Sequence, residues 1–172
     1  MKIVLFILLG VVALIVLAAL VLYAAGSRMP RAHRTVVTAT LRTDRAAAWA
    51  AITNYAAMPE WWPAVKSVRL EKLGDGTELA WNQDAHGQEI PFRTVESRVN
   101  EKLVRVIAKD DLPLGGAWTF ELAEAPGGGT QLTLTEDGII KPPLFRAIAQ
   151  WFIGLDATQK DFIAHLRKRL GE

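Results

Sequence analysis

The residue with the clearest chemical potential is Glu136, in the strand-like stretch TQLTLTED. Because side chains alternate between the two faces of a strand, Glu136 shares a face with Leu132 and Leu134. A carboxylate on an apolar face needs a partner or a raised pKa, and it could then orient a ligand hydroxyl or act as a general acid or base. The alternative is a position at the rim, where Glu136 pairs with an arginine such as Arg93 or Arg98.

Aromatic residues are the second candidate group. Six tryptophans are many for a chain of 172 residues, and large flat side chains suit the wall of a cavity for an apolar ligand. The same alternation puts Trp81, Phe92, Trp118 and Phe120 on the apolar faces of their predicted strands. The alternative is that the aromatic rings fill a closed core. The complete set of cavity-lining candidates is Trp62, Trp81, Phe92, Trp118, Phe120, Glu136 and Phe152.

Other reactive patterns are missing from the sequence. His33, His86 and His165 lie far apart without metal-ligand spacing, and His86 falls in a polar turn where a histidine is ordinarily solvated. The chain has no cysteine, which excludes disulfides, thiolate metal sites and a cysteine nucleophile. No phosphate-binding loop, GxSxG motif or Ser/His/Asp arrangement occurs. We therefore expect no metal and no cofactor, and we assign no residue as catalytic.

An uncharged run of 23 residues, 3–25, opens the chain. As a helix it spans about 34 Å, enough for a hydrocarbon core of about 30 Å. A cleaved signal peptide has a shorter apolar region and small residues at −3 and −1, whereas Tyr23 or Leu22 would stand at −3 here. We expect residues 1–26 to form a retained transmembrane anchor, followed by a linker over 27–33.

The lipid bilayer, contacted through 3–25, is thus an expected partner, and the side on which the domain lies is open. Arg28, Arg31 and Arg34 follow the apolar run and Lys2 precedes it, so the positive-inside rule favours a single-pass protein with a cytoplasmic domain. A short Met-Lys start before a long apolar run is also typical of exported anchors.

The remaining ~145 residues fit one domain of common size. Alternating β-branched residues predict a strand over 34–41. Thr43 or Asp44 then caps an alanine-rich helix, and a short second helix or turn ends near Pro63. Short turns join the strand-like segments that follow, which predicts an antiparallel meander over 64–72, 77–83, 88–99, 102–108, 115–124 and 130–137.

Apolar residues recur at helical spacing from Leu144 to Leu170, which predicts one long helix over 143–170. Such a helix spans about 40 Å and can cover the apolar face of the sheet. The predicted fold class is α+β, with a curved antiparallel sheet of about seven strands around this long helix, two short helices after the first strand, and an N-terminal transmembrane helix. Gly154 is expected to allow close packing between helix and sheet.

Two stretches of this sequence resemble a known family. AAAWAAITNYAAMPEWWPAVKSV resembles the opening of START-like proteins, also called the SRPBCC or polyketide cyclase/dehydrase and lipid transport superfamily, and GGGTQLTLTEDG followed by PPLFRAIAQWFIG resembles its bacterial polyketide-cyclase-like branch. The resemblance covers about 34–170 and implies a helix-grip domain over 34–172 with an elongated apolar cavity. Members bind lipids, sterols, polyketides or other hydrophobic molecules, and a minority catalyse cyclisation or dehydration. These are packing motifs, so they specify fold more than function.

Three functions are consistent with these features. The first is a membrane-anchored domain that binds a small hydrophobic or lipid-like molecule in an internal cavity without catalysis. The second is a cyclase or dehydratase that uses Glu136 between aromatic walls. The third is a structural or regulatory membrane module whose partner binds the outer surface, although no protein partner can be named. A net charge of +2 gives no reason to expect nucleic acid.

Overall fold

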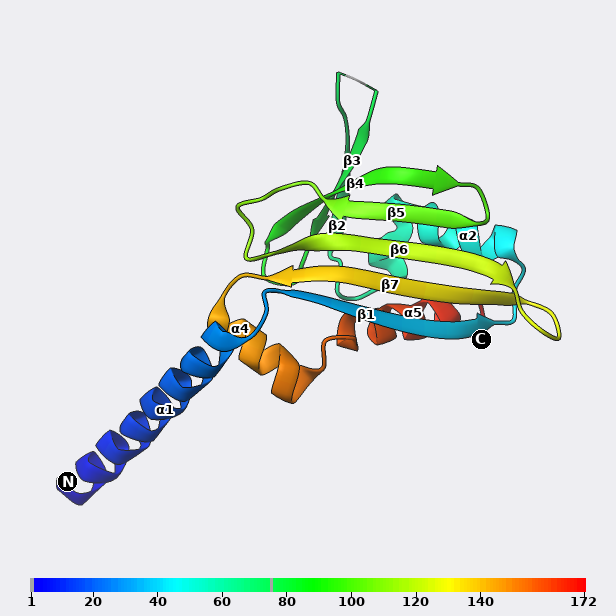
Figure 1. Cartoon of the computed structure of the whole chain (residues 1–172). Coiled ribbons are helices and arrows are strands. Elements are labelled where there is room, and N and C mark those ends of the chain that lie inside the picture. The colour runs from blue at the N-terminus through cyan, green and yellow to red at the C-terminus, as the bar shows by residue number, and fades with distance from the viewer. Residues whose placement is uncertain (1, 75) are drawn as a thin grey trace.

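The computed structural model of the protein describes residues 2–74 and 76–172 (Figure 1). Met1, the first residue of the predicted anchor, and Asp75, in the predicted turn 74–76, lie outside the described residues. The elements in chain order are helix α1 (Lys2–Arg28), β1 (Ala32–Leu41), α2 (Arg45–Thr53), the 3-10 turn η1 (Tyr55–Ala57), α3 (Met58–Trp61), β2 (Ser67–Lys72), β3 (Glu78–Gln83), β4 (Glu89–Arg98), β5 (Lys102–Ile107), β6 (Leu114–Glu124), β7 (Thr130–Ile140), α4 (Pro143–Ile148), the π-helical turn η2 (Ala149–Ile153) and α5 (Ala157–Arg169).

The seven strands form one antiparallel sheet in the order β1-β7-β6-β5-β4-β3-β2. Strands β2 to β7 are a meander, as the short turns predict, and β1 adds to the far edge with Val37 opposite Leu134. Asp44 caps α2 by accepting a hydrogen bond from the Ala47 amide at 2.8 Å, which satisfies a donor at the start of the helix. The predicted α+β helix-grip fold is confirmed.

The core lies between the concave face of the sheet and helices α2 and α5. Leu134 of β7, Ile52 of α2 and Phe162 of α5 are fully buried there. Gln159 of α5 is buried with them and hydrogen-bonded at both ends of its amide. Its Oε1 accepts from Thr35 Oγ1 at 2.6 Å and its Nε2 donates to the Leu134 carbonyl oxygen at 2.8 Å. Because both amide groups are satisfied, Gln159 fixes α5 against β1 and β7.

The continuous helix predicted over 143–170 is wrong in its middle. Helix α4 ends at Ile148, the π-helical turn η2 ends at Ile153, and Gly154 then takes a φ of 94°. Glycine adopts this left-handed conformation at little cost, whereas other residues are strained there. Gly154 therefore turns the chain instead of packing a straight helix. Helix α4 lies beside the end of α1, η2 follows α4, and of these three segments only α5 lies in the grip of the sheet (Figure 1).

Helix α1 is long and apolar enough to cross a membrane, judged by length and composition, and it projects away from the sheet (Figure 1). Its last turn packs on α4. Gly26 is buried at this contact, where an added Cβ would collide with the backbone of Pro143. The buried Arg146 donates from Nε to the Gly26 carbonyl oxygen at 2.8 Å. Only residues 29–31 of the predicted linker 27–33 lie outside regular secondary structure, because α1 runs to Arg28 and β1 begins at Ala32.

Candidate ligand-binding site

A partly enclosed cavity of about 400 Å³ lies between the concave face of the sheet and helices α3, η2 and α5. Most of its lining is apolar. Small-molecule sites typically have volumes of about 300–1,000 Å³, so this cavity is large enough for a ligand. Its aromatic walls come from Trp62, Phe92, Trp118, Phe120 and Phe162.

The aromatic wall is held by ring contacts and one hydrogen bond. The ring centroid of Phe162 lies 5.0 Å from that of Trp62 and 5.7 Å from that of Trp118, with both pairs edge to face. This is a favourable arrangement for aromatic quadrupoles. Trp62 Nε1 also donates to Asp161 Oδ2 of α5 at 2.8 Å. The wall is therefore preorganised, with the indole of Trp62 fixed against α5.

Five of the seven predicted lining residues, Trp62, Phe92, Trp118, Phe120 and Glu136, line this cavity, and their part in binding stays a prediction. Trp81, which was also a predicted lining residue, is not among the residues that line this cavity. The small Ala80 and the polar Asn82 are the buried residues of β3. On the other face, Trp81 Nε1 donates to Glu71 Oε2 at 2.7 Å and its ring lies under the Arg69 guanidinium. In this strand, size and apolar character therefore do not identify the inward residue.

Phe152 does not line the cavity either, and its side chain is 72% exposed. The prediction placed it on the apolar stripe of one straight helix. The turn at Gly154 separates η2 from α5, so the phase of that stripe is lost and Phe152 faces outward. Its neighbour Ile153 is also largely exposed but reaches the edge of the cavity.

The strongest polar feature of the cavity is Arg105 of β5, which is only 5% exposed. Its guanidinium carbon lies 3.9 Å from the ring centroid of Tyr55 and 4.9 Å from that of Phe92. Its Nε and Nη2 have no hydrogen-bond partner among the described residues, and Asn82 Oδ1 likewise has none. Burial lowers the pKa of Arg105 to about 10, against the opposing effect of Tyr55. At neutral pH it is therefore a buried cation with unused donors.

A second polar group in the cavity is formed by His33 of β1 and Glu136 of β7, with Nε2 and Oε1 3.8 Å apart. Burial raises the pKa of Glu136 and lowers the pKa of His33, so both shifts favour the neutral forms. Gly138 makes the arrangement possible, because an added Cβ would collide with the imidazole. The rim arginines considered as partners lie elsewhere: Arg98, for example, pairs with Glu96.

These two polar groups stand at opposite ends of one row across the sheet. Arg105 is opposite Trp118 in the β5–β6 pair, and Trp118 is opposite Glu136 in the β6–β7 pair. Strands lie about 4.8 Å apart, so roughly 10 Å separates the backbones of Arg105 and Glu136. An apolar molecule lying on Trp118 could place an anionic or oxygen-rich group at Arg105 and a hydroxyl or carbonyl group near Glu136.

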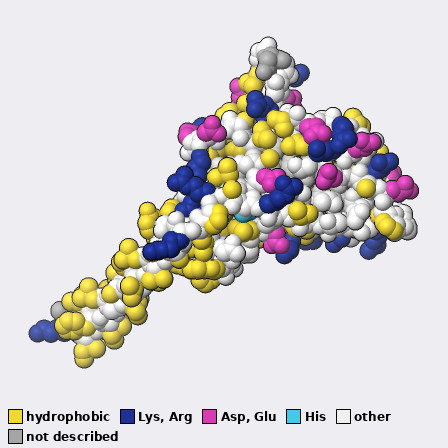
Figure 2. Space-filling view, viewed as in Figure 1, with side chains coloured by type: hydrophobic (Ala, Val, Ile, Leu, Met, Phe, Trp, Pro, Cys, Tyr) yellow, Lys and Arg dark blue, Asp and Glu magenta, His cyan; other side chains and the backbone are white. Residues whose placement is uncertain are grey.

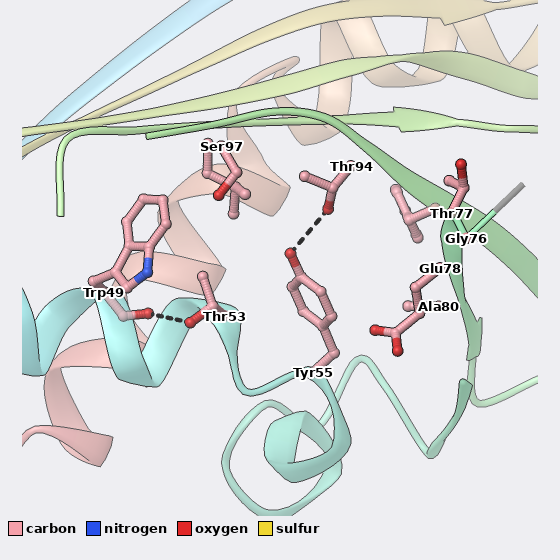
Figure 3. Close-up of a pocket in the computed structure, with 11 residues that line it drawn as sticks. Trp49, Thr53, Tyr55, Gly76, Thr77, Glu78, Ala80, Thr94 and Ser97 are labelled. Carbon is pink, nitrogen blue, oxygen red and sulfur yellow. Dashed lines mark hydrogen bonds between the residues drawn. The ribbon is translucent and has the colours of Figure 1, made fainter. Parts of the chain in front are cut away.

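A second hollow of about 580 Å³ lies between α2, η1 and strands β3 and β4 (Figure 3). It is more open, and much of its lining is polar. The Tyr55 hydroxyl points at Thr94, with the two oxygens 3.1 Å apart. Tyr55 lines this outer hollow, Arg105 lines the inner cavity and Phe92 lines both, so their stack is the partition between them. The inner cavity suits an apolar ligand better.

Two of the polar residues in the inner cavity were not among the predicted candidates. Arg105 could have been found, because alternation in KLVRVIA puts it on the same face as the apolar Leu103 and Ile107. His33 could not, because the first strand was predicted to begin at 34 and His33 carried no motif. Its position opposite Gly138 depends on the β1–β7 register, which joins the two ends of the domain sequence.

A curved antiparallel sheet wrapped on a C-terminal helix, with an apolar cavity between them, defines a helix-grip domain of the START-like class. The model of the family described as polyketide cyclase / dehydrase and lipid transport matches residues 32–171. The chain belongs to this family, which confirms the resemblance that its motifs indicate. No sequence in a search of curated proteins matches the chain.

Solved structures show the same fold. The di-domain ARO/CYC StfQ from the steffimycin biosynthetic pathway is 14% identical with a TM-score of 0.65 over 82% of this chain, which spans 52% of StfQ. A START superfamily protein from Mycobacterium smegmatis is 16% identical with a TM-score of 0.61, covering 80% of this chain and 96% of that one. MLL2253 from Mesorhizobium loti is 19% identical with a TM-score of 0.61, covering 81% and 97%. Identities this low establish the fold alone.

Proposed function

We propose that the protein binds one amphiphilic molecule, with an apolar body and an anionic or oxygen-rich head, in the cavity between the sheet and α5. The observation that carries this proposal is Arg105, a buried guanidinium with two nitrogens unpaired among the described residues. A buried charge without a partner is costly, and a carboxylate or phosphate can accept two parallel hydrogen bonds from a guanidinium. The aromatic wall would hold the apolar body.

We propose further that α1 is a retained single-pass anchor, so that the ligand is drawn from the membrane. The contact between α1 and α4 supports retention over removal as a signal sequence. Cleavage after Gly26 would remove the carbonyl oxygen that accepts the hydrogen bond of the buried Arg146, and cleavage before it would leave this acceptor on a free terminal residue without its helix. The arginines that follow the apolar run, Arg28, Arg31 and Arg34, favour the cytoplasmic side by the positive-inside rule.

Binding of a fluorescent long-chain fatty acid and its methyl ester to the full-length protein tests the proposed head group site. We expect Arg105→Met to weaken binding of the acid by about 10-fold or more, because hydrogen bonds to charged groups contribute about 1.5–3 kcal/mol. The ester should lose little. Arg93→Met is the matched control, because Arg93 is an exposed arginine of the neighbouring strand. Equal affinity of Arg105→Met and the wild type for the acid would refute the proposal.

A catalytic role is the second candidate, and the His33–Glu136 pair is what favours it. A carboxyl group whose pKa is raised by burial, beside an imidazole whose pKa is lowered by burial, is suited to proton transfer during a cyclisation or dehydration. Glu136→Gln would then abolish turnover while leaving fatty acid binding intact. The cavity volume of about 400 Å³ argues against the third possibility, a module that acts only through its outer surface.

A further inference from the structure

Four large apolar side chains are exposed on the short segment formed by α4 and η2. Phe145, Trp151, Phe152 and Ile153 are each between 52% and 72% exposed. Contiguous apolar surface of this kind is unfavourable in water and marks an interaction site. The segment is not a loose loop, because Arg146 fixes it to the end of α1 through the Gly26 carbonyl oxygen.

This segment lies at the end of the domain from which α1 projects (Figure 1). Hydrophobic side chains cover α1 and continue onto the adjoining end of the domain, with Lys and Arg side chains at the junction (Figure 2). Arg28 and Arg31 are the first cations after the apolar run. In a bilayer crossed by α1, these cations would lie at the lipid headgroups, and the exposed apolar side chains of α4 and η2 would reach into the boundary between headgroups and acyl chains. This is the arrangement of interfacial segments.

The same segment borders the cavity. Ile153, Gly154 and Leu155 belong to its lining, and so do Leu114 and Ile139 from β6 and β7, both of which are partly exposed. The cavity therefore approaches the surface between η2 and these two strands. Gly154, with its positive φ, and the irregular turn η2 form the helical side of this opening.

We infer that α4 and η2 lie in the interface of the bilayer crossed by α1, and that the cavity opens into that interface between η2 and strands β6 and β7. This inference rests on the proposed function. A ligand with an apolar body then passes between bilayer and cavity without crossing water. The occupant of the exposed face is the bilayer and not a second copy, because the face is continuous with the apolar surface of α1 and is bordered by cations.

Spin labels on single cysteines test the position of η2, since the chain has no cysteine of its own. Phe152→Cys and Val99→Cys are matched, because the native side chains are 72% and 71% exposed. Val99 lies in the turn between β4 and β5, away from α1 (Figure 1). In vesicles of phosphatidylcholine and phosphatidylglycerol, the label at 152 should be several-fold less accessible to a water-soluble nickel complex than the label at 99, and more accessible to oxygen.

Equal nickel accessibility at the two positions would overturn the inference, as would dipolar broadening of the label at 152, which a second copy on this face would produce. The opening is tested by Ile153→Trp, which should slow loading of the fluorescent fatty acid from the same vesicles several-fold. An unchanged loading rate would overturn it. If the label at 152 is accessible to nickel while the wild type binds fatty acid normally, this inference alone is refuted. If the label at 152 is protected from nickel but the wild type binds no fatty acid, the proposed function is refuted.

Discussion

Replacing Arg105 with methionine should make the ligand-free protein more stable while it weakens binding of an anionic ligand. Arg105 is 5% exposed, and its Nε and Nη2 have no hydrogen-bond partner among the described residues. Methionine is also unbranched, and its sulfur makes favourable contacts with aromatic rings such as those of Tyr55 and Phe92. The substitution thus removes the cost of a buried charge and leaves most of the packing in place.

The size of the effect follows from the pKa of Arg105, which burial lowers from the ordinary 12.5 to about 10. The difference of 2.5, at 1.36 kcal/mol per pKa unit, corresponds to about 3 kcal/mol against the charged form in the folded state. Two cation–π contacts offset about 1–2 kcal/mol of this cost. The variant should therefore gain about 1–2 kcal/mol, or about 3–7 °C in melting temperature for a domain of this size.

The pH dependence of this gain has a defined sign. Because the folded-state pKa of Arg105 is lowered, the destabilisation is fully present below about pH 10, where the residue is charged in both the folded and the unfolded state. It disappears only as the pH rises above that value. The difference in melting temperature between the variant and the wild type should consequently be constant across the neutral range.

Thermal unfolding of the delipidated full-length protein, followed by tryptophan fluorescence, measures the gain. Arg93→Met controls for the loss of one positive charge and should shift the melting temperature by less than the equivalent of about 0.5 kcal/mol. Saturating fatty acid should then stabilise the wild type more than Arg105→Met. A lower melting temperature for Arg105→Met than for the wild type would refute the reasoning. It would mean that the charge and the hydrogen-bond donors of the guanidinium are already compensated in the ligand-free protein.

Three further predictions test the rest of the site and its support. Burial raises the pKa of Glu136 above its ordinary 4.5, so its favourable contribution is complete at acidic pH and is lost as pH rises; Glu136→Gln should gain stability relative to the wild type from acidic to neutral pH, which melting curves will measure. Gly138→Ala should push the His33 ring from its place, so the lowered pKa of His33 should return toward 6.5 in an NMR titration, and an unchanged value would contradict the packing described. Gly26→Val should collide with α4 and destabilise the domain by about 2 kcal/mol, whereas Gly10→Val, with no neighbour within 4 Å, should have no such effect on the melting temperature.

Much of the fold could be predicted because its signals are local. Asp44 before an alanine-rich stretch specifies the start of α2, and β-branched alternation with glycine-rich turns specifies the strands. The break in the C-terminal helix could not be predicted from the apolar period alone. A glycine such as Gly154 destabilises a helix by only about 1 kcal/mol relative to alanine, so a continuous helix remains compatible with the sequence. What decides in favour of the break is the tertiary contact of α4 with α1 through Arg146.

The candidate site was predictable to the extent that strand alternation identifies the inward face. Trp118, Phe120 and Glu136 follow from it, because apolar residues neighbour them at every second position. Trp81 shows where alternation is insufficient. Its ring lies on the outward face, where Arg69 stacks on the ring and Glu71 accepts a hydrogen bond from the indole nitrogen. Contacts between residues far apart in the chain, such as His33 against Glu136, need the sheet register and carry no local signal.

The proposed cavity ligand is one amphiphile per chain, with its head at Arg105. Native mass spectrometry of the full-length protein, released from its own membrane, tests this claim most directly. We predict one bound molecule per chain, with an apolar body and an acidic head, in the wild type and in Arg93→Met, and a marked loss of it in Arg105→Met. An empty wild-type protein, or the same bound molecule retained equally by all three proteins, would contradict the account.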